Sequence, residues 1–147
     1  MKRREFFKAG LIGATLPTLT FGNSELRRNQ KSPVIITTHN FPKANAAAVE
    51  VLKNYGSSMD AAEAGCRAIE ADENNSNAGI GSLPDEDGRV TLDSCVMDSN
   101  GNCGSVAFLQ NIVHPVSVAR KVMEDTKHVM LVGRGAKKFA ISKGFKH

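Results

Sequence analysis

Two apolar runs on either side of an Asn-Gly turn constrain the fold of this 147-residue chain more than any other feature. The runs cover residues 89–97 and 103–109, and the turn between them reads Asp98-Ser99-Asn100-Gly101-Asn102. Apolar runs around an Asn-Gly pair are typical of a β-hairpin, because Asn and Gly adopt the positive φ that tight turns require. We therefore expect an antiparallel hairpin here. We also expect Asp93 and Asp98 to serve its structure rather than catalysis or metal binding.

Helical patterns precede the hairpin. A β-branched run at 34–37 predicts a buried strand, and the apolar spacing at 44–54 predicts a helix that Gly56 ends. The segment Ser57-Ser58-Met59-Asp60 is typical of a capping box, so it predicts the start of a second helix that runs to about Glu70. Its small residues should allow close packing against a sheet; they are Ala61, Ala62, Ala64 and Gly65.

Strand and helix patterns continue after the hairpin. His114-Pro115 interrupts the chain, a helix is expected at 116–124, a strand at 128–132, and a turn and helix at 133–142. The Gly133-Arg134-Gly135 segment lacks the Lys-Thr pair of a phosphate-binding loop, which favours a simple helix-entry turn. This alternation predicts an α/β (α+β) fold, in which a lone sheet would leave one face uncovered.

Charge is concentrated at the N-terminus. Residues 1–23 carry a formal charge of +3, so only +1 of the total of +4 belongs to the rest of the chain. The chain has one Tyr and no Trp, and its cations form no stripe with interleaved aromatic residues. This pattern argues against a nucleic-acid partner.

The first 23 residues resemble an export signal. Arg3-Arg4-Glu5-Phe6-Phe7-Lys8 follows the twin-arginine pattern, and the uncharged run at 9–22 suits a signal segment but is too short for a stable membrane anchor. We expect a twin-arginine-like signal at 1–23, a polar linker at 24–32, a domain at 33–147, and export to a bacterial periplasm. A disordered basic N-terminus is the alternative, and the cleavage site stays open.

The three cysteines do not predict a metal site. Cys66, Cys95 and Cys103 form no C-x-x-C motif and no paired Cys/His spacing, so we expect neither a metal nor another cofactor. Cys66 is expected to be a small buried residue. An oxidising compartment would permit one disulfide, for which Cys95 and Cys103 are the closest pair in sequence.

Three segments carry a family resemblance: PDEDGRVTLDSCVMD at 84–98, HPVSVARKVMEDTKHVMLVG at 114–133 and FAISKGF at 139–145. They resemble the α-chain half of a glycosylasparaginase, within the type-2 asparaginases and the N-terminal-nucleophile hydrolases. The resemblance runs from about 32 to 145. It implies an αββα four-layer sandwich built from an α chain and a β chain. This chain would then be an incomplete sandwich that lacks the nucleophile half.

The resemblance also implies chemistry that these residues do not supply. Family members hydrolyse a side-chain amide with an N-terminal Thr that a precursor exposes by cleaving itself, in a context such as His-Asp-Thr or Gly-Thr-Val-Gly. No threonine here has that context; the threonines are at 15, 18, 20, 37, 38, 91 and 126. We therefore expect no catalytic residue in this chain and no amidase activity from it alone.

Several functional alternatives stay open. Once completed by a β chain, in a homo- or hetero-oligomer, the protein would take a small amide: asparagine, N-acetylglucosaminyl-asparagine or an isoaspartyl peptide. The alternative is a non-catalytic exported remnant or binding module of the same fold. Apolar faces that evolved to meet a partner sheet, such as Val106/Phe108 or Met130/Val132, should be exposed and cause association.

Two segments match positions that line the pocket in relatives. His39-Asn40-Phe41 falls where glycosylasparaginases carry Trp-x-Phe, so Phe41 matches a pocket wall and His39 departs from it. The departure weakens the expectation of a preference for sugar-linked asparagine, and the alternative is a loop histidine without a chemical role.

The second segment is Asn77-Ala78-Gly79-Ile80-Gly81-Ser82, which resembles the plant-type Asn-Ala-Gly-x-Gly-Ser. The resemblance implies that Asn77, Gly79, Gly81 and Ser82 belong to a loop that supports the nucleophile, with an ordinary glycine-rich turn as the alternative.

Overall fold

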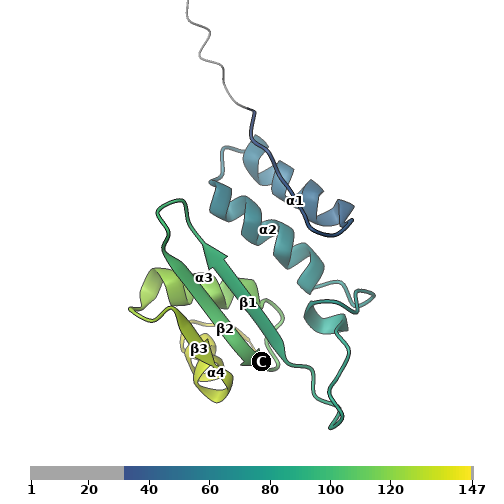
Figure 1. Ribbon diagram of the computed structural model, residues 1–147, viewed down its shortest axis with the longest axis vertical. Helices are drawn as coiled ribbons and strands as arrows, with labels where there is room; N and C mark the ends of the chain where they lie inside the picture. The colour runs from purple at the N-terminus through teal and green to yellow at the C-terminus, as the bar shows by residue number, and fades with distance from the viewer. Residues whose placement is uncertain (1–31, 147) are drawn as a thin grey trace, which may run out of the picture. The chain divides into compact units, whose positions relative to one another are not determined.

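The computed structural model describes residues 32–146, which form four α-helices, one short 3-10 helix and a three-stranded sheet (Figure 1). This mixed composition confirms the α/β class. The expected signal at 1–23 and all of the linker except Ser32 lie outside the described residues. In chain order the elements are α1 (Pro42–Lys53), α2 (Ser58–Glu70), η1 (Gly79–Gly81), β1 (Leu92–Met97), β2 (Cys103–Leu109), α3 (Pro115–Asp125), β3 (Met130–Val132) and α4 (Gly133–Ser142).

The expected hairpin is present. β1 and β2 pair antiparallel, and Gly101 adopts a positive φ of 85° in the turn. Asp98 Oδ1 accepts hydrogen bonds from the backbone N–H groups of Asn100 and Asn102 at 2.8 and 2.9 Å. Asp93 Oδ1 accepts from the backbone N–H of Phe108 at 2.7 Å, beside the irregularity in the β1–β2 register. Both carboxylates therefore hold the hairpin in shape, as predicted.

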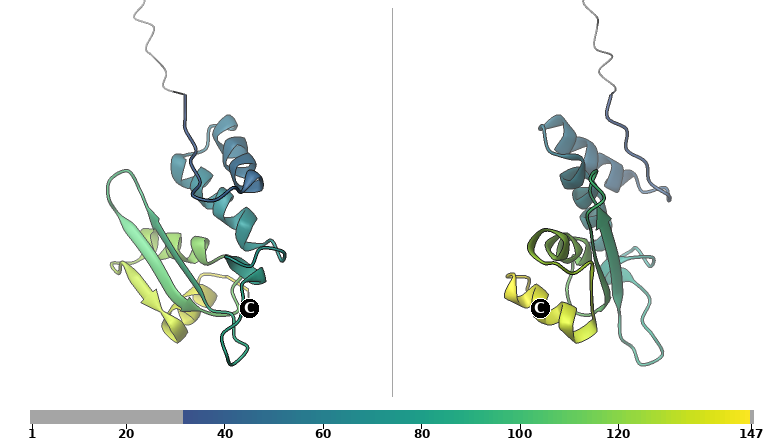
Figure 2. Two further views of the ribbon diagram at one scale, coloured as in Figure 1. Left: turned by 45° about the vertical axis from the view of Figure 1, so that its right-hand side comes forward. Right: turned by 60° about the vertical axis from the view of Figure 1, so that its left-hand side comes forward.

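A crossover helix then adds a parallel strand. β3 pairs parallel to β2, and the intervening α3 begins at a proline, a residue suited to the first turn of a helix. α3 and α4 cover the same face of the sheet (Figures 1 and 2). The contact between β2 and α3 is tight at Gly104, where a Cβ would collide with the backbone of Ala119 and Met123. The core lies between these layers and consists of Val96, Val106, Leu109, Ile112, Val116, Val118, Ala119, Val122, Ala136 and Ala140.

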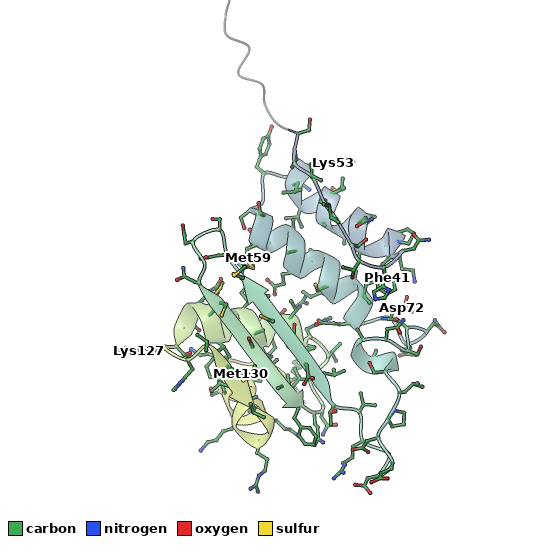
Figure 3. All side chains as sticks on the ribbon, in the orientation of Figure 1. Phe41, Lys53, Met59, Asp72, Lys127 and Met130 are labelled. Atoms are coloured by element: carbon green, nitrogen blue, oxygen red, sulfur yellow. The ribbon has the colours of Figure 1, made fainter. Side chains whose placement is uncertain are left out.

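The opposite face of the sheet carries exposed apolar side chains. Met130 lies on this face (Figure 3). Met130 and Val132 are 52% and 55% exposed, and Met97 on β1 is 68% exposed. Phe108 is also exposed. The sequence predicted exposure for four residues, and this is confirmed for Phe108, Met130 and Val132. The prediction is wrong for Val106. Val106 is buried because it pairs with Leu131 and Ser94 on the helix-covered side, out of phase with Met130 and Val132.

The first two helices pack against each other. Small residues permit this approach, since a Cβ at Gly65 would lie 3.2 Å from the carbonyl oxygen of Ala44. The expectation that the small residues of α2 pack against a sheet is therefore wrong: α1 is their partner. The predicted capping box is confirmed, because Ser57 accepts from the backbone of Asp60 and the Asp60 carboxylate accepts from the backbone of Ser57.

The predicted strand at 34–37 is also wrong. The segment belongs to no sheet, and Val34 and Ile36 are 79% and 85% exposed. A β-branched run favours an extended backbone, but a strand also needs a neighbouring edge with which to share hydrogen bonds. Among residues 32–146 no strand lies beside this segment.

The cysteines are all free. Cys95 pairs with Ser105 and Cys103 with Met97, so the two cysteines occupy diagonal positions on the sheet rather than facing ones. Cys66 is exposed, and its expected burial is wrong because this position of α2 faces a surface groove rather than the core. None of the helices within 32–146 combines the length and the apolar character needed to cross a bilayer.

Candidate functional site

Hydrogen bonds from an asparagine side chain hold the loop between α2 and β1 in shape. Asn75 Nδ2 donates to the carbonyl of Ala78 at 3.2 Å, and Asn75 Oδ1 accepts from the backbone N–H of Asn77 at 3.2 Å. Lys43 Nζ on α1 donates to Asp72 Oδ2 at 2.8 Å, which brings the start of α1 beside this loop (Figure 3). The loop is therefore held at both its polar start and its centre.

Close packing explains the two glycines of the loop. Gly79 has a φ of 80°, and a Cβ there would collide with the backbone of Glu70. A Cβ at Gly81 would lie 2.5 Å from the carbonyl oxygen of Glu73 and 2.6 Å from that of Asn75. The glycines are required because the loop folds back against the end of α2, a constraint that an ordinary exposed turn does not have.

A polar pocket of about 360 Å³ opens beside the loop. Three of the four predicted loop residues line it: Asn77, Gly79 and Ser82. Gly81 does not, since it packs on the other side of the turn. The remaining lining residues come from α2, the loop, the approach to β1 and the start of α3; they are Glu70, Ser76, Ala78, Leu83, Thr91, Leu92, Asp93 and Pro115.

Glu70 is the buried acid of this pocket and is only 6% exposed. Its Oε1 accepts from the backbone N–H of Val116 at 2.9 Å, and its Oε2 lies 3.4 Å from Nδ1 of His114. Burial raises the pKa of the Glu70 carboxyl to about 7, against the opposing effects of the Val116 hydrogen bond and of Arg67. Burial also lowers the pKa of the His114 imidazole, and the charge of Arg67 lowers it further.

Sequence motifs did not single out Glu70, Asn75 or His114 as site residues. One signal was present for Glu70. A carboxylate at the last position of a helix opposes the helix dipole, so its placement there calls for a compensating contact. The long-range contact to Val116, 46 residues away, could not be inferred from spacing.

A second, apolar groove of about 620 Å³ lies on the other side of the loop. His39 and Phe41 line it, with their ring centroids 5.5 Å apart. The rest of the groove is formed by residues 33–38 and by apolar side chains of α1 and α2. Ala78 lines both the groove and the polar pocket, so the two predicted site segments meet at this residue.

This arrangement can bind a polar ligand. The pocket offers hydroxyl, amide and carboxylate groups that can hold a polar ligand. Among residues 32–146, no hydroxyl of the pocket is hydrogen-bonded to Glu70, Asp93 or His114. A Ser or Thr side chain can be activated by a base beside it, and the hydroxyls of this pocket have no side-chain base hydrogen-bonded to them among the described residues.

Comparison with known proteins shows which family the chain resembles. The profile of the asparaginase family matches residues 16–147. The chain is 51% identical over 120 residues to an N(4)-(beta-N-acetylglucosaminyl)-L-asparaginase of Elizabethkingia miricola, covering 81% of this chain and 35% of that protein.

Two further relatives extend the comparison. The N(4)-(beta-N-acetylglucosaminyl)-L-asparaginase of Rattus norvegicus is 40% identical over 86% of this chain and 37% of its own length. A plant-type L-asparaginase of Thermococcus kodakarensis is 40% identical over 84% of this chain and 40% of its own length. The chain thus spans well under half the length of these relatives, and it belongs to the asparaginase family.

Proposed function

We propose that this chain is the α-chain part of an asparaginase-family amidohydrolase that cleaves the side-chain amide of asparagine or of N-acetylglucosaminyl-asparagine. The nucleophilic Thr comes from the complementary part, after self-cleavage of a precursor. One observation carries the proposal: the loop at Asn77–Ser82 is pinned against α2 and opens on a polar pocket whose hydroxyls have no side-chain base hydrogen-bonded to them among the described residues. Such a pocket suits a loop that supports a nucleophile supplied by another segment.

Complementation tests the proposal. The purified 147-residue chain is mixed with the C-terminal part of the Elizabethkingia miricola relative, prepared so that it begins at its implied N-terminal threonine. Release of aspartate is then measured from asparagine, from N-acetylglucosaminyl-asparagine and from a β-aspartyl peptide. We expect no release by either part alone and release by the mixture. Aspartate release that tracks the amount of this chain alone would contradict the proposal.

A pair of asparagine variants localises the effect. Asn77→Ala should lower kcat of the mixture by about tenfold or more, because Asn77 lines the pocket beside the loop. Asn100→Ala is the matched control, since Asn100 lies exposed in the hairpin turn. Equal activity of the two variants would show that Asn77 does not contribute to the site.

The same proposal extends to the wall of the groove. His39 stands where the resemblance implies a Trp, and its ring packs near Phe41. His39→Trp should therefore raise kcat/KM for N-acetylglucosaminyl-asparagine relative to asparagine. An unchanged ratio of the two kcat/KM values would show that His39 does not determine substrate preference.

In the complete protein, the open face of the sheet packs against a second sheet to form the four-layer αββα sandwich. The apolar side chains of this face, Met97, Met130 and Val132, support this part of the proposal, because soluble proteins rarely leave such a face in water.

Export through a twin-arginine pathway completes the proposal and rests on the Arg3-Arg4 pair. A reporter fused behind residues 1–32 should reach the periplasm of a bacterial host, and the double change Arg3→Lys with Arg4→Lys should stop it. Lys2→Arg serves as the control because it keeps the pair and the charge. Equal export of all three fusions would argue against this pathway.

A further inference from the structure

Glu70 lies at a junction of three segments. The backbone of Glu70 contacts Gly79 so closely that a Cβ on Gly79 would collide with it. Its Oε1 accepts a hydrogen bond from the backbone of Val116 in the first turn of α3. Its side chain also lines the polar pocket. One residue thus joins the end of α2, the glycine loop and the start of α3.

The second carboxylate oxygen of Glu70, Oε2, lies near the imidazole of His114. Glu70 Oε2 and His114 Nδ1 are both buried and lie 3.4 Å apart, and neither atom makes a hydrogen bond among the described residues. Two bare lone pairs at this separation would repel each other, so at least one of the two atoms carries a proton. Because Oε2 makes no hydrogen bond, a charged Glu70 carboxylate costs free energy to bury here, and the protonated, neutral form is favoured.

Other charged groups near this pair come from three elements. Arg67 and Glu63 of α2 act on both members, and Arg67 itself donates to Ser117 of α3 at 2.8 Å. Cys66 lies one turn before Glu70, and Asp93 at the start of β1 lines the same pocket. Arg67 is the one cation among these groups. It favours the charged carboxylate and opposes a charged imidazole.

We propose that Glu70 is a positioning residue for the loop at Asn77–Ser82, and that its protonated, neutral form keeps that loop joined to the first turn of α3. The raised pKa of Glu70 places the uptake of this proton near neutral pH. The loop should be held most firmly below that pH. The loop's catalytic relevance rests on the proposed function, whereas the junction itself does not.

Amide hydrogen exchange of the full 147-residue chain tests the junction without any assay of activity. Exchange of the Ser82 amide, which donates to the carbonyl of Gly79, is followed between pH 5.5 and 8.5 and corrected for intrinsic exchange. In the wild-type chain we expect protection to fall at least fivefold as pH rises through about 7. Glu70→Gln keeps an acceptor for Val116 and an N–H donor for His114, so protection should stay high and independent of pH.

Two further variants complete the test. Glu70→Ala should lose protection of the loop at every pH, whereas amides within α1 should exchange as in the wild type. Glu86→Gln, in an exposed loop, is the matched control and should keep the wild-type pH dependence. Wild-type protection in Glu70→Ala, or a pH step that persists in Glu70→Gln, overturns the proposal. Failure of complementation together with the expected exchange pattern would instead refute the proposed function alone.

Discussion

At the residue scale, Tyr55 shows how a helix end can differ from the simplest reading of its sequence. Gly56 was expected to end α1 through the freedom of its backbone. Tyr55 instead adopts the left-handed conformation, with φ at 61°, and the N–H groups of Tyr55 and Gly56 donate to the carbonyls of Leu52 and Val51. This is a Schellman motif with Tyr where Gly is preferred. Gly56 is required for space, because a Cβ there would collide with the Val51 side chain.

Tyr55→Gly should therefore stabilise the chain. The tyrosine side chain is 99% exposed and loses no packing, while the left-handed backbone costs a non-glycine residue about 1 kcal/mol. Urea unfolding should give a free energy of unfolding higher by about that amount. Tyr55→Ala is the control, since it keeps the Cβ and should give little gain. An equal gain from both variants would locate the effect in the side chain instead.

Also at the residue scale, Glu70 should make stability depend on pH. Its folded-state pKa of about 7 is raised above the ordinary value of 4.5, so the folded chain holds a proton that the unfolded chain releases. This contribution is complete below pH 4.5 and is lost as pH rises through about 7. The lowered pKa of His114 acts in the opposite direction below its ordinary value of 6.5.

The clearest window therefore lies just above pH 6.5. From about pH 6.5 to 7.5, the free energy of unfolding of the wild type should fall by about 0.7 kcal/mol relative to Glu70→Gln. Denaturant melts of both proteins across this range check the difference. Parallel pH dependence would show that Glu70 titrates at its ordinary value.

At the element scale, α2 depends on contacts near its N-terminus. Its start is closed by Ser57 and Asp60, and its exposed side meets α3 through Arg120, which donates to Asp60 and Glu63 at 2.7 Å each. The hydrogen bond from the Ser57 hydroxyl, then that from Arg120, lowers the pKa of Asp60 to about 2. Local capping and a contact 60 residues away thus act on the same carboxylate.

Ser57→Ala should destabilise the chain by about 1 kcal/mol at pH 7, the usual effect of losing an N-cap. It should also raise the pKa of Asp60, although Arg120 keeps that pKa below its ordinary value. Thermal unfolding and carboxyl NMR titration measure the two effects. Ser58→Ala changes the neighbouring hydroxyl, which caps nothing, and should leave both quantities near wild type. An equal loss from Ser58→Ala would contradict the capping role.

At the scale of the whole molecule, the described part of the chain has one sheet with helices on a single face. The open face presents Met97, Met130 and Val132, which no described residue covers. Burial of such side chains is favourable by roughly 25 cal/mol per Å² of apolar surface, so the face favours association.

The isolated chain should therefore associate as its concentration rises. Sedimentation velocity should show oligomers in the wild type and fewer in the double variant Met130→Lys with Val132→Lys. Ile141→Lys, on α4, changes an equally exposed apolar residue away from this face and should leave association unchanged. A wild-type monomer with a sharp melting transition that is independent of concentration would contradict the expectation.

Local chemistry explains what the sequence alone determined. The hairpin, the capping box of α2 and the helix-entry turn at Gly133 depend on neighbouring residues, so turn and cap preferences were sufficient to predict them. The family resemblance likewise located the loop at Asn77–Ser82. The asparagine and the glycines that identify this loop can be read directly from the sequence.

Only the tertiary structure decided which partners these segments meet. The run at 34–37 has strand propensity, but no strand edge lies beside it among the described residues. Val106 is buried and Phe108 is exposed although they are two residues apart on β2, because Phe108 adopts a positive φ of 53° beside the irregularity in the β1–β2 register. The small residues of α2 meet α1, and Glu70 meets Val116 and His114. The physical reason is the same in each case: burial and hydrogen bonding between distant segments depend on the path of the chain in space, which local propensity does not encode.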